Sequence, residues 1–160
     1  ANLSNAPFRM YKRYTHEGGV ATPLIVHWPA GLKSQGELRH APSHIIDIAP
    51  TCLSAAGLSA KRMEGKSLLP VFVRDSKDER TLYWEHEGNR AVRKGDYKLV
   101  AMHDASWQLY NMAEDRSELK DLLEDMPGKA NELRLLYEAW AKRVGALPWE
   151  QVIAARKKSK

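Results

Sequence analysis

The sequence predicts an α+β fold in which a four-stranded antiparallel sheet packs on a helix. Two observations predict the sheet and its cover. Short stretches of strand composition, separated by turn residues, follow one another at residues 82–86, 90–93, 97–101 and 107–111. An amphipathic helical stripe follows at residues 133–144. A third observation, the apolar stretch 23–28, predicts a buried strand that precedes this unit.

The strand predicted at residues 23–28 reads Pro-Leu-Ile-Val-His-Trp, and Pro29 and Gly31 end it. A strand that is apolar on both faces is typical of a parallel sheet covered on both sides. We therefore interpret it as the edge piece of an α/β sheet whose other strands lie outside this chain. An exposed strand of this kind invites pairing, so we expect the isolated chain to dimerise or aggregate.

A helix is predicted between Ser43 and Gly57, and Pro50 falls inside it. Either the helix begins near Ala49, with Asp47 as its cap and Pro50 at its first position, or it kinks at the proline. We favour the cap at Asp47. Cys52 is the one cysteine of the chain, which excludes an internal disulfide and a multi-cysteine metal site. We expect its small side chain to be buried on this helix.

The predicted sheet needs a cover on its apolar face. Alternation places Leu82, Trp84 and His86 on one face of the first strand. The covering helix presents an apolar stripe made of Leu133, Leu136, Tyr137, Trp140 and Val144. The alternating charges of the neighbouring strands are interpreted as a solvated sheet face; they are Arg93, Lys94, Asp96 and Lys98.

The chain is expected to have three parts: residues 1–75, residues 76–150 and a basic tail at 151–160. The formal net charge is +5, and part of it lies in that tail. No aromatic residues are interleaved with the tail's basic residues, so we interpret it as a solvated end and expect no nucleic-acid partner. No apolar run approaches the roughly 18 residues of a membrane span, so we expect no membrane partner.

The stretch from Lys12 to Gly19 has the outline of an anion site. Two adjacent glycines, Gly18 and Gly19, allow a left-handed backbone or a close approach of another group. Lys12 lies a few residues upstream and is placed to project into the same space. A fixed ammonium beside a permissive backbone is suited to hold an anion.

Lys12, Glu17-Gly18-Gly19 and Trp28-Pro29-Ala30-Gly31 together form a pattern that resembles the sulfatases, specifically bacterial arylsulfatase-like enzymes of the alkaline phosphatase superfamily. The resemblance continues through residues 47–51, 89–100 and 107–111, so nearly the whole chain is similar to the C-terminal third of such an enzyme. It implies a C-terminal fragment that hydrolyses aryl or carbohydrate sulfate esters once joined to an N-terminal α/β domain and that is inactive alone. For the full-length bacterial enzyme it implies a periplasmic or extracellular location.

The resemblance also implies roles for four residues. Lys12 corresponds to the family's catalytic lysine, which contacts the bound sulfate and the leaving-group oxygen and stabilises negative charge there. His16 is a substrate-binding candidate that donates to an anion or protonates a leaving group. His86 and Arg90 flank a hairpin turn that reaches toward the pocket in sulfatases, so both are candidates for substrate binding.

The family's nucleophile and metal ligands are not found in this sequence. Formylglycine forms within Cys/Ser-x-Pro/Ala-x-Arg, which the residues after Cys52 do not match. Calcium needs about six oxygen ligands, and Asp47, Asp96 and Asp104 share no loop. We assign no metal to this chain, and the resemblance places calcium and formylglycine in the N-terminal part.

Two alternatives remain open at this point. A related phosphodiester or phosphonate hydrolase shares the anion site, and a non-catalytic module would use the hairpin surface to bind a carbohydrate or a protein. The sequence upstream of this chain separates them, because a formylglycine motif selects a sulfatase whereas an unmodified threonine nucleophile favours phosphoryl transfer.

Overall fold

The computed structural model describes residues 5–33, 36–75 and 79–158. The chain forms two compact units: the first combines Ala1–Pro23 with Arg80–Lys160, and the second is Leu24–Glu79. The N-terminal segment therefore folds with the sheet, although 56 residues separate the two in sequence (24 to 79). The predicted division near residue 75 concerns the domains of a longer protein and stays a prediction.

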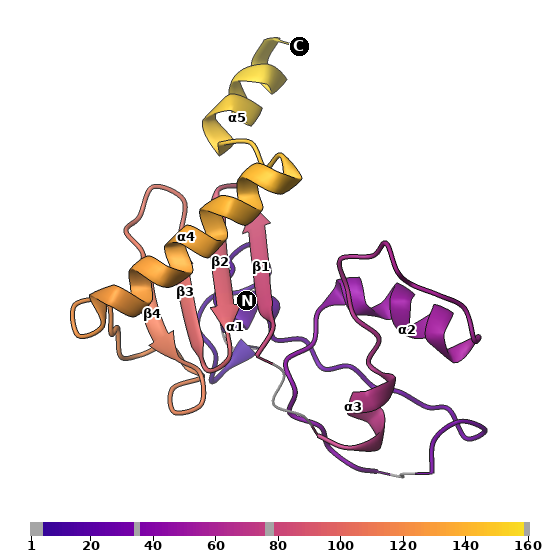
Figure 1. The fold of residues 1–160 in the computed structure, drawn as a ribbon. Coiled ribbons are helices and arrows are strands. Elements are labelled where there is room, and N and C mark those ends of the chain that lie inside the picture. Colours follow the sequence, from indigo (N-terminus) through magenta and orange to yellow (C-terminus); the bar gives the residue numbers. More distant parts are fainter. Residues whose placement is uncertain (1–4, 34–35, 76–78, 159–160) are drawn as a thin grey trace. The chain divides into compact units, whose positions relative to one another are not determined.

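The first unit is built on the predicted antiparallel meander (Figure 1). Its strands pair in sequence order and are β1 (Thr81–His86), β2 (Asn89–Lys94), β3 (Tyr97–Ala101) and β4 (Gln108–Asn111). Gly88 and Gly95 have φ values of 82° and 58° in the two tight turns. Glycine adopts this left-handed conformation without a Cβ clash, so the turns form where the sequence predicts them. The four predicted strands are confirmed to within one residue.

Helix α4 (Pro127–Val144) covers one face of the sheet, as predicted (Figure 1). Leu133 lies in the centre of the core between helix and sheet, together with Val92, Leu99, Leu109, Ala130 and Tyr137. Trp140 stacks on Tyr83 of β1 with ring centroids 5.0 Å apart. Val144 is 45% exposed, so the buried stripe ends before it. The fold class, a mixed α+β arrangement with this sheet packed on a helix, is confirmed.

The opposite face of the sheet is also buried, which the sequence did not predict. Ala91, Val100, Tyr110 and Met112 form a second cluster there, with Trp84 against it. The N-terminal segment lies over this face: the Arg9 guanidinium donates to the Tyr110 hydroxyl at 3.0 Å. Helix α1 (Glu17–Val20) belongs to this segment. The interpretation of Lys98 as part of a solvated face is therefore wrong.

The C-terminal tail forms a helix, and its residues are exposed or half-buried, in agreement with the expectation of a solvated end. Helix α4 ends at Gly145, whose φ of 71° places it in the left-handed region. Helix α5 (Trp149–Lys158) follows and has no buried residue. Within the residues that the structure describes, no helix combines the length and the apolar character that a membrane span requires.

The second unit contains a short 3-10 helix η2 (Ile45–Asp47) and the helices α2 (Ile48–Ala55) and α3 (Leu69–Val73). The predicted cap is wrong in its detail: the Asp47 carboxylate accepts from the backbone N–H of His44 at 2.7 Å and of Lys66 at 3.0 Å, and does not cap α2. The reason lies in Pro50. It occupies the third position of α2 and has no N–H for a cap to bind.

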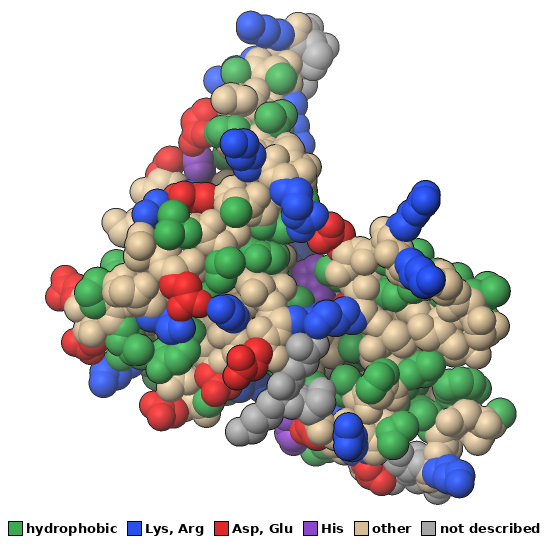
Figure 2. Space-filling view, viewed as in Figure 1, with side chains coloured by type: hydrophobic (Ala, Val, Ile, Leu, Met, Phe, Trp, Pro, Cys, Tyr) green, Lys and Arg blue, Asp and Glu red, His purple; other side chains and the backbone are tan. Residues whose placement is uncertain are grey.

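The strand predicted at residues 23–28 does not form, and no strand is assigned to it. Ile25 is 90% exposed and Leu24 is 50% exposed. A strand needs a neighbour for its N–H and C=O groups, and the described residues provide none here. Cys52 is exposed as well, so the expectation that it is buried is wrong. Figure 2 shows hydrophobic side chains at the surface of this unit.

Candidate functional site

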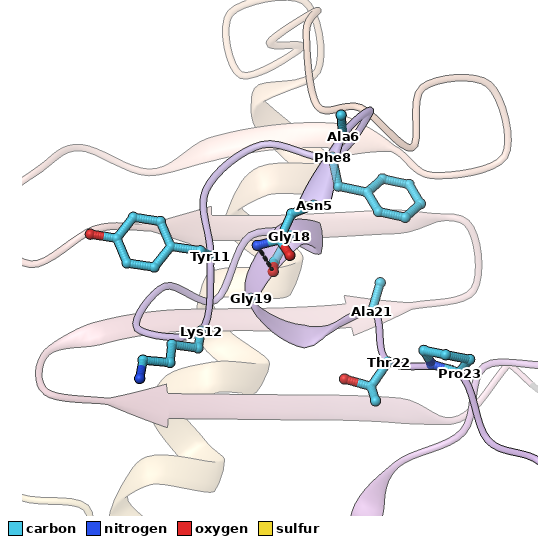
Figure 3. A pocket seen from close by; sticks show the side chains of 10 residues that line it. All are labelled: Asn5, Ala6, Phe8, Tyr11, Lys12, Gly18, Gly19, Ala21, Thr22 and Pro23. Atoms are coloured by element: carbon cyan, nitrogen blue, oxygen red, sulfur yellow. Dashed lines mark hydrogen bonds between the residues drawn. The ribbon is translucent and has the colours of Figure 1, made fainter. Parts of the chain in front are cut away.

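A cavity of about 600 Å³ lies along the N-terminal segment of the first unit. Figure 3 shows Tyr11 and Lys12 on one side of the glycine pair and Ala21, Thr22 and Pro23 on the other. The remaining lining residues are Asn5, Ala6, Phe8, Gly18 and Gly19. Lys12 is the one lysine among the residues that line the cavity, so the structure places the predicted catalytic residue at a site of ligand size.

The glycine pair closes the chain on itself. The N–H of Gly18 donates to the carbonyl of Arg9 at 2.9 Å, which joins the two ends of residues 9–18, here called the Lys12 loop. A Cβ added at Gly18 would overlap the carbonyl oxygens of Arg9 and Met10, and one added at Gly19 would overlap that of Tyr14. The sequence predicted a close approach at these glycines, and the approaching group is the backbone of the same loop.

Lys12 lies at the exposed tip of this loop. The N–H of Tyr14 donates to the carbonyl of Tyr11 at 2.8 Å and closes a tight turn around Lys12. Within the described residues its ammonium has no hydrogen-bond or ion-pair partner. An uncommitted ammonium on a loop closed by backbone hydrogen bonds is chemically suited to bind an anion.

His16 is a buried residue of the loop and is not among the residues that line the cavity. Its side chain is 0% exposed; Nε2 is 3.5 Å from Oε1 of Gln108, and Nδ1 has no hydrogen-bond partner among the described residues. Burial lowers the pKa of His16, and the charges of Lys98 and Arg9 act in the same direction, whereas Glu118 and Gln108 oppose them. The lowered pKa favours the neutral imidazole.

The structure separates His86 from Arg90. Arg90 pairs with Glu85 across the hairpin, and its guanidinium lies 4.7 Å from the centre of the Trp107 ring. Trp107 packs on the core beneath α4, so Arg90 belongs to that face of the sheet. His86 is the next residue along β1 after Glu85, so it points to the opposite face, where the N-terminal segment lies.

The turn that follows His86 contacts the Lys12 loop. The side chain of Asn89 donates to the carbonyl of Arg13 at 3.3 Å, and Arg13 forms an ion pair of 3.0 Å with Glu87. The structure therefore brings together the Lys12 loop and the hairpin that carries His86. It does not bring Arg90 to this site.

A buried ion cluster holds the Lys12 loop to the sheet, and the sequence analysis missed it. The ammonium of Lys98 on β3 lies 3.1 Å from Oε1 of Glu17 and 2.9 Å from Oε1 of Glu118. Lys98 and Glu118 are 0% exposed, and Glu17 is 5% exposed. Arg116 adds a second cation, 3.2 Å from Oε2 of Glu17.

The charges of the cluster stabilise one another. Burial alone would raise the pKa of Glu17, but the Lys98 ammonium and the Arg116 guanidinium outweigh it and hold this pKa below its ordinary value. Removing one partner of a buried ion pair costs about 3 to 5 kcal/mol, because the remaining charge is left uncompensated. One signal was present in the sequence: alternation along β3 puts Lys98 on the same face as Val100, an apolar residue that is buried.

Comparison with known proteins identifies the family. Residues 8–142 match the family described as N-sulphoglucosamine sulphohydrolase, C-terminal. The chain belongs to this family. The recognition of a C-terminal sulfatase part is therefore confirmed, and the relatives do not favour the two alternatives.

The relatives are sulfatases. An uncharacterized sulfatase of Schizosaccharomyces pombe is 31% identical over 159 residues, which is 87% of this chain and 28% of that protein. The N-acetylgalactosamine-6-sulfatase of Mus musculus is 33% identical over 118 residues, 70% of this chain and 22% of that protein. The crystal structure of Ps i-CgsB superposes with a TM-score of 0.73 at 26% identity, covering 86% of this chain and 32% of that one. This sulfatase chain spans less than a third of the length of each.

This part of a sulfatase does not provide a calcium site among its described residues. Across residues 5–33, 36–75 and 79–158, one group of side chains is close enough to share an ion: His103, Asp104 and Glu150. The two carboxylates lie beside different nitrogens of the His103 ring: Asp104 is near Nε2, and Glu150 is near Nδ1. Calcium prefers six to eight oxygen ligands, and this group offers two carboxylates, so the residues do not fit the ion.

Proposed function

We propose that this chain is the C-terminal part of an enzyme that hydrolyses sulfate esters and that Lys12 is its catalytic residue within this part. The observation that carries the proposal is that Lys12, whose ammonium has no partner among the described residues, is one of the residues that line the cavity, on a loop that the glycine pair closes. Membership of the sulfatase family supports the same reaction class.

Lys12 supplies charge stabilisation in this proposal. Cleavage of a sulfate ester places negative charge on the leaving oxygen, and a preorganised ammonium stabilises that charge more in the transition state than in the bound substrate. This interaction raises kcat because the ammonium stabilises the transition state more than the bound substrate. Lys12 carries no nucleophile role, since an alkylammonium has no free electron pair.

The nucleophile and the calcium ligands belong, in this proposal, to the N-terminal part of the enzyme. The sequence contains no Cys/Ser-x-Pro/Ala-x-Arg motif that would give formylglycine. Two buried carboxylates, Glu17 and Glu118, are already bound to Lys98. The isolated chain is therefore inactive, and its partner is the N-terminal domain of the same protein. We infer that the exposed apolar residues Leu24, Ile25 and Val26 contact that domain.

The substrate proposed for the full-length enzyme is a carbohydrate or aryl sulfate. The relative from mouse is named for a sulfated sugar, which favours a carbohydrate sulfate. His86 is the better-placed of the two hairpin candidates for substrate binding, because its turn contacts the Lys12 loop. His16 is buried within the loop, so it acts on substrate only through the position of the loop's exposed residues. Arg90 lies against Trp107, on the face of the sheet opposite to the N-terminal segment.

Replacement of Lys12 in the full-length enzyme tests the proposal. Lys12→Ala is expected to lower kcat/KM for aryl sulfates by a factor of about 100 to 1,000, the loss typical of one charge-stabilising donor. The loss should grow as the leaving phenol becomes more basic, because more charge then needs stabilisation. The measurement is steady-state hydrolysis across a series of substituted phenyl sulfates.

Lys120→Ala is the matched control, because Lys120 is an exposed lysine of the same unit that does not line the cavity. It should stay within about twofold of wild type. If Lys12→Ala also stays within twofold across the series, Lys12 is a solvated loop residue and its assignment is wrong. If the enzyme prefers a phosphodiester to every sulfate ester tested, the reaction class is wrong.

A further inference from the structure

Glu118 contacts both ends of the Lys12 loop. At the C-terminal end of the loop, Oε2 of Glu118 accepts a hydrogen bond of 2.9 Å from the backbone N–H of Glu17. At the other end, the backbone carbonyl of Glu118 accepts from the guanidinium of Arg9. Glu118 is far from the loop in sequence, and it holds both ends of the loop, at Arg9 and at Glu17.

The same two points are joined within the loop itself. Gly18 follows Glu17 and donates its N–H to the carbonyl of Arg9 at 2.9 Å. Asn5 adds two hydrogen bonds, to the carbonyl of Met10 at 3.1 Å and to that of Gly18 at 3.0 Å. The base of the loop is therefore a closed backbone ring, and Glu118 attaches this ring to the sheet.

The attachment is rigid on the side of the sheet. Lys98 is on β3, a strand with a neighbour on each side, and its ammonium lies 2.9 Å from Oε1 of Glu118. Each oxygen of the Glu118 carboxylate therefore faces a different element: Oε1 forms an ion pair with the lysine of the sheet, without the geometry of a hydrogen bond, and Oε2 accepts from the loop. A carboxylate held on both oxygens has little freedom to shift.

The backbone around Glu118 is also held in place. Glu118 has a φ of 56°, an unfavourable value for a residue with a long side chain. Oδ2 of Asp115 accepts hydrogen bonds of 2.8 Å from the N–H groups of Leu119 and Lys120 on the far side of Glu118. These bonds keep the turn in the conformation that directs Glu118 inward, and strained backbone of this kind persists where the surroundings fix it.

We propose that Glu118 is a positioning residue for catalysis: its carboxylate, bound between Lys98 and the backbone of Glu17, fixes the height and direction of the loop that presents Lys12. This inference rests on the proposed role of Lys12. Glu118 touches neither substrate nor the reacting atoms, since it is fully buried. Its effect on the reaction therefore passes through Lys12, and a shift of the order of 1 Å in a reacting group lowers rates by up to about 100-fold.

Glu118→Gln in the full-length enzyme tests the proposal. Glutamine keeps an oxygen that accepts from Glu17 but loses the charge that holds Lys98 in place. We expect kcat for aryl sulfates to fall about 10- to 100-fold with KM changed by less than about threefold, since the loss concerns charge stabilisation in the transition state. Rates are divided by the concentration of folded enzyme, so that a variant that is only less stable does not show a lower kcat.

The decisive measurement is a double-mutant cycle with Lys12→Ala. If Glu118 acts through Lys12, adding Glu118→Gln to Lys12→Ala lowers kcat by no more than about twofold beyond Lys12→Ala itself. The dependence on leaving-group basicity should also steepen in Glu118→Gln, as it does in Lys12→Ala. A purely structural role moves neither quantity once rates are corrected for folded enzyme.

Glu132→Gln is the matched control. Glu132 also binds two lysines, Lys94 at 2.9 Å and Lys129 at 2.6 Å, but Lys94 is at the end of β2 and Lys129 on α4. This variant should keep wild-type kcat and the wild-type leaving-group dependence. If Glu118→Gln does not fold, Arg9→Met replaces it, because Nη1 of Arg9 donates to both Tyr110 and Glu118 and the methionine side chain has no N–H to donate to either. A loss of about three- to tenfold, again absent on a Lys12→Ala background, is expected from it.

The outcomes separate the two proposals. If Lys12→Ala lowers the rate but Glu118→Gln, corrected for folding, behaves as the control does, the positioning role is overturned and the proposed function stands. The positioning role is also overturned if the two losses multiply in the double variant. If Lys12→Ala itself has no effect, the proposed role of Lys12 fails, and the positioning role fails with it.

Discussion

The two units of this chain differ in how much of their apolar surface they bury by themselves. In the first unit, α4 covers one face of the sheet and the N-terminal segment the other, which leaves side chains such as Val92, Leu99 and Leu133 almost without exposure. In the second unit, Leu68 and Pro50 are the buried apolar residues within its described part. The apolar residues that it exposes are Leu24, Ile25, Val26, Leu38, Ile45, Ile46, Ile48, Leu58, Met63 and Val73.

The difference shows which unit carries its own stability. The hydrophobic contribution to folding is proportional to the apolar area removed from water, so the first unit has a core and the second has little of one. The second unit is held by polar contacts instead, such as those of Asp47 to His44 and Lys66. Its apolar surface is what a partner would cover, and this chain covers less than a third of the length of each relative.

The largest expected effect is on the core of the first unit. Leu133→Ala should lower the free energy of unfolding by about 3 to 5 kcal/mol, because it leaves a cavity between α4 and the sheet. Leu38→Ala makes the same chemical change in the second unit, where the side chain is 78% exposed, and should cost less than about 0.5 kcal/mol. Urea denaturation of both variants, followed by tryptophan fluorescence, measures the contrast, and equal losses would contradict it.

A smaller effect is expected on association through the second unit. Ile25→Asp should weaken self-association of the isolated chain about tenfold or more, since a large apolar side chain contributes about 1.5 to 3 kcal/mol when it is covered. Leu119→Asp is the control, because that leucine is similarly exposed but belongs to the first unit. Analytical ultracentrifugation over a range of concentrations distinguishes them. A wild-type chain that stays monomeric throughout would show that the exposed segment does not associate.

The smallest effect concerns pH and the first unit alone. Because burial lowers the pKa of His16 below 6.5 in the folded chain, the unfolded chain binds a proton more readily. This contribution to stability is complete above pH 6.5 and is lost as the pH falls from there through the lowered folded value. His16→Gln should remove this loss between pH 6.5 and 5, whereas His27→Gln, at an exposed residue of the second unit, should not. Parallel pH dependences in all three chains would rule out His16 as the cause.

The sequence predicted the elements whose signals are local. Turn residues beside alternating strands predicted the hairpins at Gly88 and Gly95, and the helical spacing of Leu133, Leu136 and Tyr137 predicted the cover. Both periodicities follow from the geometry of a single element. The prediction at residues 23–28 was wrong for the complementary reason: the composition was that of a strand, but a strand depends on a neighbour, which the described residues do not provide.

The candidate site divides in the same way. Lys12 and the glycine pair were found from the sequence because a close approach of the backbone requires glycine at those positions. The hydrogen bond from Glu118 to the loop could not be predicted from the sequence. Glu118 and Glu17 are 101 residues apart, and the residues around each carry no pattern that indicates the contact. His86 and Arg90 looked equivalent in the sequence, and the register of β1 with β2 separated them onto opposite faces.

The sequence by itself determined the class of this protein: a sulfatase-family loop with a glycine pair, followed by a meander and its helix. The signal for each of these lies in residues that are close together along the chain. Only the tertiary structure decided that the meander is covered on both faces, and with that the state of Lys98. A lysine in a strand of alternating charges is normally solvated. Once the N-terminal segment lies over this face, the same lysine is cut off from water and binds two carboxylates brought from distant parts of the chain. Ion pairs between residues that are distant in sequence depend on three-dimensional contact, and a local sequence pattern does not predict them.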